Sequence, residues 1–475
     1  MRNPLFGRPS DIVFERDAPD AAVIAHSLET TEHRVFWLDD VGDHTVYPTL
    51  DAWLDVDLAV VGGGYLGLWS AVKAKQRNPH LRVALLEGQT IGWAASGRNG
   101  GFCDASLTHG ELNGANRWPK ELETLNRLGH ENLAAMEREI AELGIDCEWE
   151  HTGSIDVAVE EHQLAWLEPE NEGFLDQASV QAELHSPTYL GGRRYRDTAM
   201  VHPAKLAKEL ARVAASLGVE VFENSQVDEL YDENGAITLT TARAGVRAGR
   251  VVLATNAFPP LLKRYRLYTV PVYDYVLTTE PLSTDQLASI GWQGRQGMAD
   301  LANQFHYYRL TADNRILFGG YDAIYHFGRD VHVSYEERDE TFHTLASHFF
   351  TTFPQLEGLR FTHRWAGAID TSSQFCAFYG LDLGGRVATA AGFTGLGVGA
   401  THFAAEVLLD RLAGLDTERT QLEMVRRKPL PFPPEPFAAA GIAATRWAMD
   451  RADHNYGRRN LLLKTLDALG LGFDS

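Results

Sequence analysis

Residues 58–67 read LAVVGGGYLG, a short apolar run followed at once by a cluster of glycines. The apolar run predicts a buried strand, and the stretch 68–77 that follows it predicts an amphipathic helix. Asn78-Pro79 ends this helix, and residues 81–86 form a second apolar run that stops at Glu87. Strand, glycine turn, helix, strand and terminal acid together predict a dinucleotide-binding unit.

The glycines of this turn have separate physical tasks. Gly62 permits the tight turn, Gly64 lets the backbone approach a pyrophosphate, and Gly67 lets the helix pack against the strand. The first N–H groups of the helix and its partial positive charge suit phosphate. Glu87 stands where a carboxylate accepts hydrogen bonds from both ribose hydroxyls and repels a 2′-phosphate. The motif therefore argues against NADP, but it does not choose between NAD and FAD.

A second small-residue loop decides that choice. Residues 90–102 read TIGWAASGRNGGF, and a loop of this composition lets the backbone wrap a flat polar group at close range. An NAD site normally continues into another helix at this point. The stretch resembles the glycine-rich segment of the FAD-dependent D-amino-acid oxidase (DAO) family. The resemblance is closest to its bacterial branch of γ-glutamylputrescine and aminophosphonate oxidoreductases, in which SGRNGGF recurs.

A third glycine turn lies near the end of the resemblance, which covers about residues 56–415. Residues 386–392 (RVATAAG) predict a strand, and residues 393–399 (FTGLGVG) open a helix. In the family, the N–H groups of this turn face the flavin pyrimidine edge, and the helix dipole stabilises negative charge on the reduced ring. The residues predicted to bind FAD are Gly62, Gly64, Tyr65, Leu66, Gly67, Glu87, Ser96, Gly97, Arg98, Asn99, Gly100, Gly101, Val227, Thr255, Asn256, Gly395, Leu396, Gly397 and Val398.

The segment between these turns changes character. The stretches 268–280, 304–310, 315–321 and 331–335 predict strands rich in Tyr, Phe, Val and Thr. The resemblance implies an α/β fold: a Rossmann-like FAD-binding domain of the glutathione-reductase type, interleaved with an antiparallel-sheet substrate domain. The expected boundaries are an N-terminal arm at 1–55, FAD-binding parts at about 56–110, 196–260 and 365–415, substrate-domain parts at about 111–195 and 261–364, and a proline-rich linker with a helical tail at 416–475.

Candidates for substrate contact are aromatic and come from the inserted sheet. Tyr273 and Tyr275 share one strand face, as do His306 and Tyr308. The competing interpretation is that they are ordinary half-buried sheet residues. Arg309 lies in a stretch that resembles the strand supplying a carboxylate-binding arginine in several family members, and the competing interpretation is a surface arginine beside Asp313.

Composition excludes several function classes. The chain has 475 residues and a formal charge of −21, which argues against nucleic acid and anionic membrane as partners. Three cysteines at unrelated spacings predict neither a disulfide framework nor a metal site. Because no apolar run approaches a membrane span and no leader opens the chain, we expect a cytoplasmic protein. The sequence does not define the oligomeric state.

The resemblance implies an enzyme that oxidises a C–N bond of an amine or amino acid by hydride transfer to flavin, with hydrogen peroxide as product. Relatives with a histidine-linked flavin carry that histidine where Arg98 falls, so we expect FAD to be non-covalent. Relatives that activate oxygen with a lysine carry it on a strand resembling residues 315–320, which has none. Two alternatives stay open: a dehydrogenase of a hydroxy acid or amine that uses another electron acceptor, and a flavin-binding protein without turnover.

Overall fold

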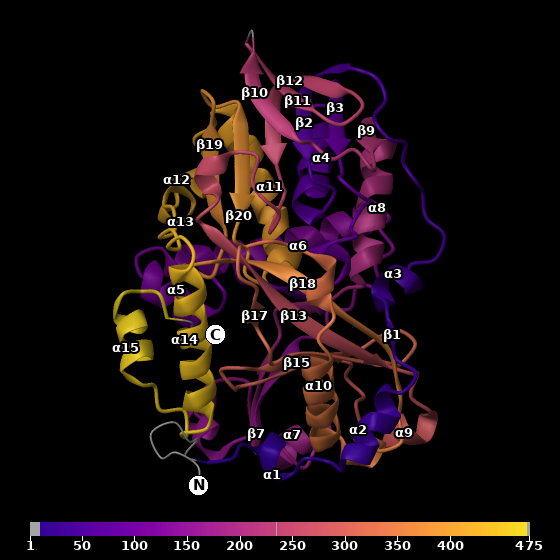
Figure 1. The fold of residues 1–475 in the computed structure, drawn as a ribbon, viewed down its shortest axis with the longest axis vertical. Coiled ribbons are helices and arrows are strands. Elements are labelled where there is room, and N and C mark those ends of the chain that lie inside the picture. Colours follow the sequence, from indigo (N-terminus) through magenta and orange to yellow (C-terminus); the bar gives the residue numbers. More distant parts are fainter. Residues whose placement is uncertain (1–9, 234, 473–475) are drawn as a thin grey trace.

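The computed structural model describes residues 10–233 and 235–472. Two sheets lie at opposite ends of its long axis (Figure 1). We call them the parallel sheet and the mixed sheet. Each sheet takes its strands from several separate segments of the chain, so neither is built from one continuous segment. This arrangement confirms the predicted α/β fold with an interleaved second sheet.

The parallel sheet contains the first glycine turn. Its parallel strands have the order β9-β3-β2-β12-β20, and the antiparallel strands β10, β11 and β19 extend it. Their bounds are β2 (Leu54–Val61), β3 (Val83–Leu86), β9 (Val219–Phe222), β10 (Glu229–Glu233), β11 (Ala236–Thr240), β12 (Gly245–Leu253), β19 (Phe378–Asp382) and β20 (Val387–Ala391). Strand β3 and the last four residues of β2 are buried on both faces and therefore read as continuous apolar runs.

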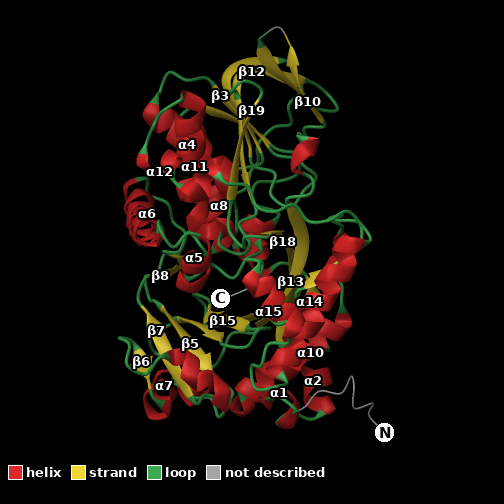
Figure 2. Cartoon of the chain, turned by 90° about the vertical axis from the view of Figure 1, so that its left-hand side faces the viewer, coloured by secondary structure: helices red, strands yellow, loops and turns green. Residues whose placement is uncertain are grey.

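Helices cover one face of the parallel sheet, as Figure 2 shows. They are α4 (Tyr65–Arg77), α6 (Leu122–Glu142), α8 (Pro203–Ser216) and α11 (Gly397–Ala413). Pro203 opens α8 at its first turn, and His202 caps that helix by accepting the N–H of Lys205. The starts of α4 and α11 are directed toward the same region between the two sheets, because each helix follows the carboxyl end of a parallel strand.

The mixed sheet has the strand order β1-β18-β13-β16-β15-β14-β5-β7-β6, and β17 pairs with β13. Helix α10 (Asp339–Thr352) packs against one face of it. The strand bounds are β1 (Glu32–His33), β5 (Ser154–Ala158), β6 (Phe174–Leu175), β7 (Gly191–Tyr195), β13 (Thr269–Thr279), β14 (Gly297–Asp300), β15 (His306–Leu310), β16 (Ile316–Gly320), β17 (Ile324–Tyr325) and β18 (Phe361–Ser372).

Two segment predictions differ from the structure. Residues 331–335 were expected to form a strand, but residues Val333–Glu336 form a short 3-10 helix, η4. Residues from 365 onward were assigned to the FAD-binding part, but β18 extends to Ser372 and pairs along its length with β13 of the mixed sheet. The long antiparallel pairing, which is non-local in sequence, decides where this strand belongs.

The arm and the tail both pack on the body. The arm contains α1 (Val13–Arg16), α2 (Ala21–Leu28) and α3 (Phe36–Asp40). Phe14 belongs to the core of the mixed sheet and Trp37 is fully buried, so the arm is not confined to the surface. In the tail, α14 (Phe437–Asp453) and α15 (Leu461–Ala468) flank the mixed sheet (Figure 1). The Asp453 carboxylate accepts the backbone N–H groups of Asn303 and Gln304. No helix among the described residues is long and apolar enough to cross a membrane.

Candidate active site

One cavity of about 2380 Å³ connects the two sheets. Its walls are the glycine turn before α4, the small-residue loop 92–101, the turn before α11, one face of the mixed sheet, and α14 of the tail. A cavity of this size exceeds an ordinary small-molecule pocket and offers room for a dinucleotide together with a substrate.

All but two of the predicted cofactor residues line this cavity. The exceptions are Gly67 and Gly97. A Cβ on Gly67 would lie 1.9 Å from the carbonyl oxygen of Gly62, and one on Gly97 would lie 2.2 Å from that of Gly92. These two glycines therefore allow the backbone to pack closely, and the residues around them form the cavity wall.

The turn before α4 fits a pyrophosphate. Gly64 stands at the N-cap of the helix and has no side chain to cap it, and a Cβ on Gly64 would lie 2.9 Å from the Ser96 hydroxyl oxygen. That hydroxyl accepts the N–H of Tyr65 at 3.0 Å. The turn before α11 is open in the same way, because a Cβ on Gly397 would meet nothing within 4 Å. Two helix starts thus direct partial positive charge into one cavity.

Glu87 lies at the end of β3, where a ribose would be bound. Its carboxylate accepts the backbone N–H groups of Gly63 at 2.6 Å and Gln89 at 2.8 Å, and the indole N–H of Trp93 at 3.0 Å. Burial raises the pKa of Glu87, and these three donors oppose that rise. The donors fix the orientation of the carboxylate beside the phosphate turn.

The small-residue loop is held by residues distant in sequence. The indole N–H of Trp37 donates to the carbonyl of Asn99 at 2.9 Å, and that of Trp365 donates to the carbonyl of Arg98 at 2.9 Å. Arg98 donates to the carbonyls of Trp93 and Ala366 and pairs with Glu336 of η4. The arm, the loop and β18 are therefore joined through one set of polar contacts, which keeps the loop conformation fixed.

Apart from Tyr273, four residues were predicted to lie at the substrate site, and three of them lie on the helix face of the mixed sheet, away from the cavity. The Tyr275 hydroxyl donates to the carbonyl of Tyr335 at 2.7 Å, and the Tyr308 hydroxyl bonds that of Tyr189 at 2.6 Å. His306 is fully buried between the Asp300 carboxylate and His348. None of the three lines the cavity. Tyr273 borders the cavity, but its ring also belongs to the core of that face.

Arg309, the fourth, points to the other face but is covered. Its guanidinium donates to the carbonyl of Val201 at 2.7 Å and that of Gly101 at 3.3 Å, and it lies 5.6 Å from the ring of Trp37. The side chain is 1 % exposed and does not line the cavity. This placement argues against the predicted contact with a substrate carboxylate, since the charge already binds backbone carbonyls.

Two residues that were not predicted face the cavity from these strands. Asp274 of β13 and Tyr307 of β15 both line it, and the Tyr307 hydroxyl donates to the Asp274 carboxylate. Each is an immediate neighbour of a residue that was chosen. Side chains alternate between the faces of a strand, so an error of one residue exchanges the two faces. A signal was present: Asp274 is a charged residue inside an otherwise apolar strand.

Other carboxylates also face the cavity. Asp156 of β5 makes no side-chain hydrogen bond or ion pair with any described residue, and burial raises its pKa to about 7. Asp104 accepts the Thr198 hydroxyl at 2.7 Å, and burial raises its pKa too. The mixed-sheet end of the cavity therefore carries acidic side chains, with Arg193 of β7 opposite Asp156, and a further cation there would lower the cost of their ionisation.

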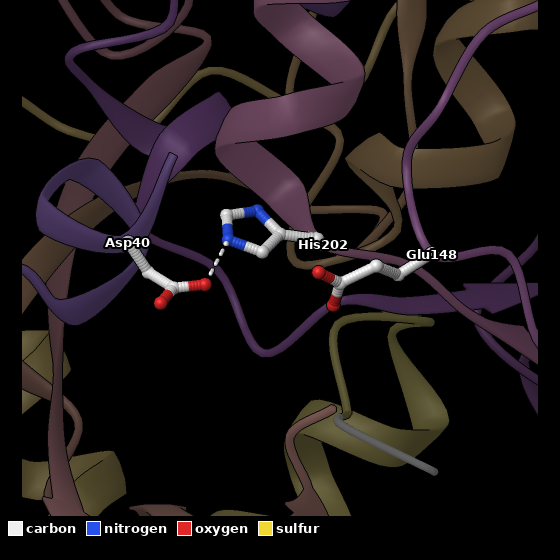
Figure 3. Close-up of side chains that lie close together, drawn as sticks. All are labelled: Asp40, Glu148 and His202. Carbon is white, nitrogen blue, oxygen red and sulfur yellow. Dashed lines mark ion pairs between the residues drawn. The ribbon is translucent and has the colours of Figure 1, made fainter. Parts of the chain in front are cut away.

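A separate group of side chains near α8 contains the residue types of a metal site, but its histidine has no nitrogen lone pair available for a metal ion. Asp40, Glu148 and His202 place their polar atoms within 4.8 Å of one another (Figure 3). The His202 Nδ1 accepts the backbone N–H of Lys205, so Nε2 carries the proton and lies 3.3 Å from Asp40. Lys205 pairs with Glu148. With these partners the ring offers no free lone pair to a metal ion.

Comparison with known proteins agrees with this geometry. The family model for FAD dependent oxidoreductase, DAO, matches residues 57–411. The chain belongs to this family. It is an FAD-dependent oxidoreductase, which confirms the family predicted from the glycine turns.

Two curated DAO-family relatives match most of the chain. The gamma-glutamylputrescine oxidoreductase of Escherichia coli strain K12 is 31% identical over 439 residues, which cover 87% of this chain and 97% of that protein. A probable oxidoreductase OrdL of Haemophilus influenzae is 28% identical over 413 residues, 82% of this chain and 90% of that protein.

The fold has counterparts among solved structures. A glycine oxidase from Geobacillus kaustophilus superposes with a TM-score of 0.62 at 20% identity, over 77% of this chain and 96% of that one. An L-proline dehydrogenase from P. horikoshii gives 0.63 at 17% identity, over 77% and 95%. At this level of identity the two structures support the fold.

Proposed function

We propose that this FAD-dependent oxidoreductase takes a hydride from the carbon beside the nitrogen of an amine substrate and passes the electrons to molecular oxygen, with release of hydrogen peroxide. The observation that carries the proposal is the single cavity that joins two glycine turns, the small-residue loop and an acidic face of the mixed sheet. The acidic face suits a substrate whose nitrogen carries a positive charge. The relative named for γ-glutamylputrescine supports an amine substrate.

In this proposal the cofactor lies along the cavity. Gly64 and the start of α4 hold the pyrophosphate, Glu87 the ribose, and the backbone at Val227 the adenine. Residues 98–101 and residues 395–398 would hold the isoalloxazine. Bound FAD supplies the hydride acceptor. The chain supplies the rest: it orients the substrate, excludes water, and places the start of α11 where negative charge collects on reduction.

We further propose that FAD is held without a covalent bond. Arg98 occupies the position of the flavin-linked histidine of some relatives, and its guanidinium is engaged by Trp93, Ala366 and Glu336. The three cysteines are buried and none lines the cavity. Acid precipitation should leave the yellow colour in the supernatant. Colour that stays with the pellet would contradict this, and His109 beside the Gly395 turn would be the first residue to examine.

A panel of amines, amino acids and hydroxy acids tests the proposed function. We expect anaerobic addition of the correct amine to bleach the flavin absorbance, and air to restore it with release of hydrogen peroxide. Bleaching without peroxide would indicate a dehydrogenase that uses another acceptor. Bleaching by a hydroxy acid alone would overturn the amine assignment, and flavin that no compound bleaches would indicate a binding protein.

A further inference from the structure

The cavity face of the mixed sheet carries one polar pair beside the small-residue loop. Asp274 and Tyr307 come from strands that are not neighbours, because β16 lies between β13 and β15. The Tyr307 side chain crosses β16 above Gly319, where a Cβ would lie 2.7 Å from both the ring carbon that bears its hydroxyl and the hydroxyl oxygen. Only a residue without a side chain permits this crossing, so Gly319 makes the pair possible.

The pair lies next to the loop that we assign to the flavin. A Cβ on Gly100 would lie 2.6 Å from the Tyr307 ring, so the ring packs directly on that loop. On the other side, Asp274 is paired in register with Gly367 of β18, and a Cβ on Gly367 would lie 3.7 Å from the Cβ of Arg98. Gly367 therefore leaves space beside the carboxylate on that side, where both residues line the cavity.

We propose that Asp274 and Tyr307 receive the reacting ammonium group of the substrate and that the Asp274 carboxylate takes its proton. This inference rests on the amine oxidation proposed above. An alkylammonium ion has a pKa near 10, as lysine does, and its nitrogen lone pair is unavailable while the proton is bound. The proton leaves nitrogen for a carboxylate oxygen of Asp274. The freed lone pair then stabilises the carbon cation as its hydride passes to the bound flavin of the proposed function, so a neutral carboxylic acid, an iminium product and reduced flavin balance the step.

The electrostatics of Asp274 support this role. Burial is the main influence and raises its pKa to about 6, while the Tyr307 hydroxyl and the N–H groups of Tyr275 and Gly320 oppose the rise. The titratable and charged groups around it are Tyr307 on the cavity side, His306 and Tyr275 on the helix face, and Arg98, paired with Glu336, beside Gly367 of β18. Removal from water disfavours both the carboxylate and the ammonium ion, and proton transfer between them removes both charges at once.

The test uses a primary amine on a tertiary carbon, such as tert-butylamine, which has no α-hydrogen and cannot be oxidised. Its binding is followed by the change in visible absorbance of the bound flavin. We expect Asp274→Asn to weaken binding at about pH 8 by at least about tenfold, the loss typical of one charged hydrogen bond. Wild-type binding should weaken below about pH 6, where the carboxylate is protonated, and binding to the variant should not change there.

Two further variants make the test specific. Asp156→Asn removes the same charge from the same cavity, and we expect a smaller loss than for Asp274→Asn. Gly319→Ala leaves both Asp274 and Tyr307 in the chain, but its methyl group pushes the Tyr307 side chain away from Asp274. We expect this variant to bind the amine more weakly and to keep a normal flavin content. Equal losses of amine binding in Asp274→Asn and Asp156→Asn would show that the amine is attracted by the negative charge of the cavity as a whole. That result would overturn the assignment of the amine to Asp274.

Measurements of turnover against pH distinguish a failure of this inference from a failure of the proposed function. In the wild type, kcat/KM for an oxidised amine should rise through about pH 6 and then level off. In Asp274→Asn it should rise about tenfold per pH unit up to the pKa of the amine, because only amine already neutral in solution can react. If the amine bleaches the flavin of both proteins with one pH profile, the inference fails and the proposed function stands. If no amine bleaches the flavin, the function fails.

Discussion

The two faces of the mixed sheet carry similar residues in different chemical settings. On the helix face, the hydroxyls of Tyr275 and Tyr308 bond to a carbonyl and to another tyrosine, and their rings pack with α10. On the cavity face, the hydroxyl of Tyr307 bonds to a carboxylate that borders the open cavity. Residue type alone therefore does not distinguish a packing tyrosine from one at the site; the partner and the face do.

The largest expected effect is the loss of FAD, the group that the cavity face of the mixed sheet is proposed to face. Gly64→Val should abolish FAD binding in a folded protein, because the new side chain would meet the Ser96 hydroxyl and fill the pyrophosphate position. The ratio of flavin to protein absorbance measures this, and circular dichroism checks the fold. A normal ratio in the purified variant would show that this turn is not the phosphate site.

The next largest effect is expected from substitution of Arg309, and it should be a loss of unfolding free energy. Arg309→Met removes a buried cation that binds three backbone carbonyls. Leaving these carbonyls without donors should cost about 2–5 kcal/mol of unfolding free energy. Thermal unfolding followed by flavin fluorescence measures the loss. A strong rise in KM for an anionic substrate with an unchanged melting temperature would instead return Arg309 to the substrate site.

Asp156 should give a smaller effect that depends on pH. Its folded-state pKa of about 7 lies above the value near 3.9 of an unfolded aspartate. The folded state then holds the proton more tightly, so ionisation of Asp156 costs stability above about pH 7, and this cost disappears as the pH falls toward about 4. We expect Asp156→Asn to raise the melting temperature at about pH 8 and to raise it less as the pH is lowered.

The exposed Glu170 offers a matched control for that measurement. Glu170→Gln makes the same change of charge outside the cavity, and we expect no pH-dependent gain. A gain of similar size for both variants would mean that the net negative charge of the whole protein is responsible, and the assignment of the effect to the cavity would be wrong.

The cofactor end could be predicted from sequence because its requirements are local. Gly62 has a φ of 112° and no room for a Cβ, and such demands fix the residue type at consecutive positions. The substrate end depends on contacts between distant strands. The alternation along β13 and β15 defines two faces, but it does not say which one the rest of the chain covers. Helix α10 covers one of these faces, and its position depends on residues outside both strands.

The most direct test of the account compares Tyr307→Phe with Tyr308→Phe. The two variants lose the same hydroxyl from adjacent positions of β15, one on each face. With the best amine of the panel, we expect Tyr307→Phe to lower kcat/KM by about tenfold or more, the loss of a hydrogen bond to a charged group. Tyr308→Phe should stay within about twofold and lower the melting temperature instead. Equal kinetic losses, or a larger loss for Tyr308→Phe, would contradict the assignment of the cavity face as the substrate site.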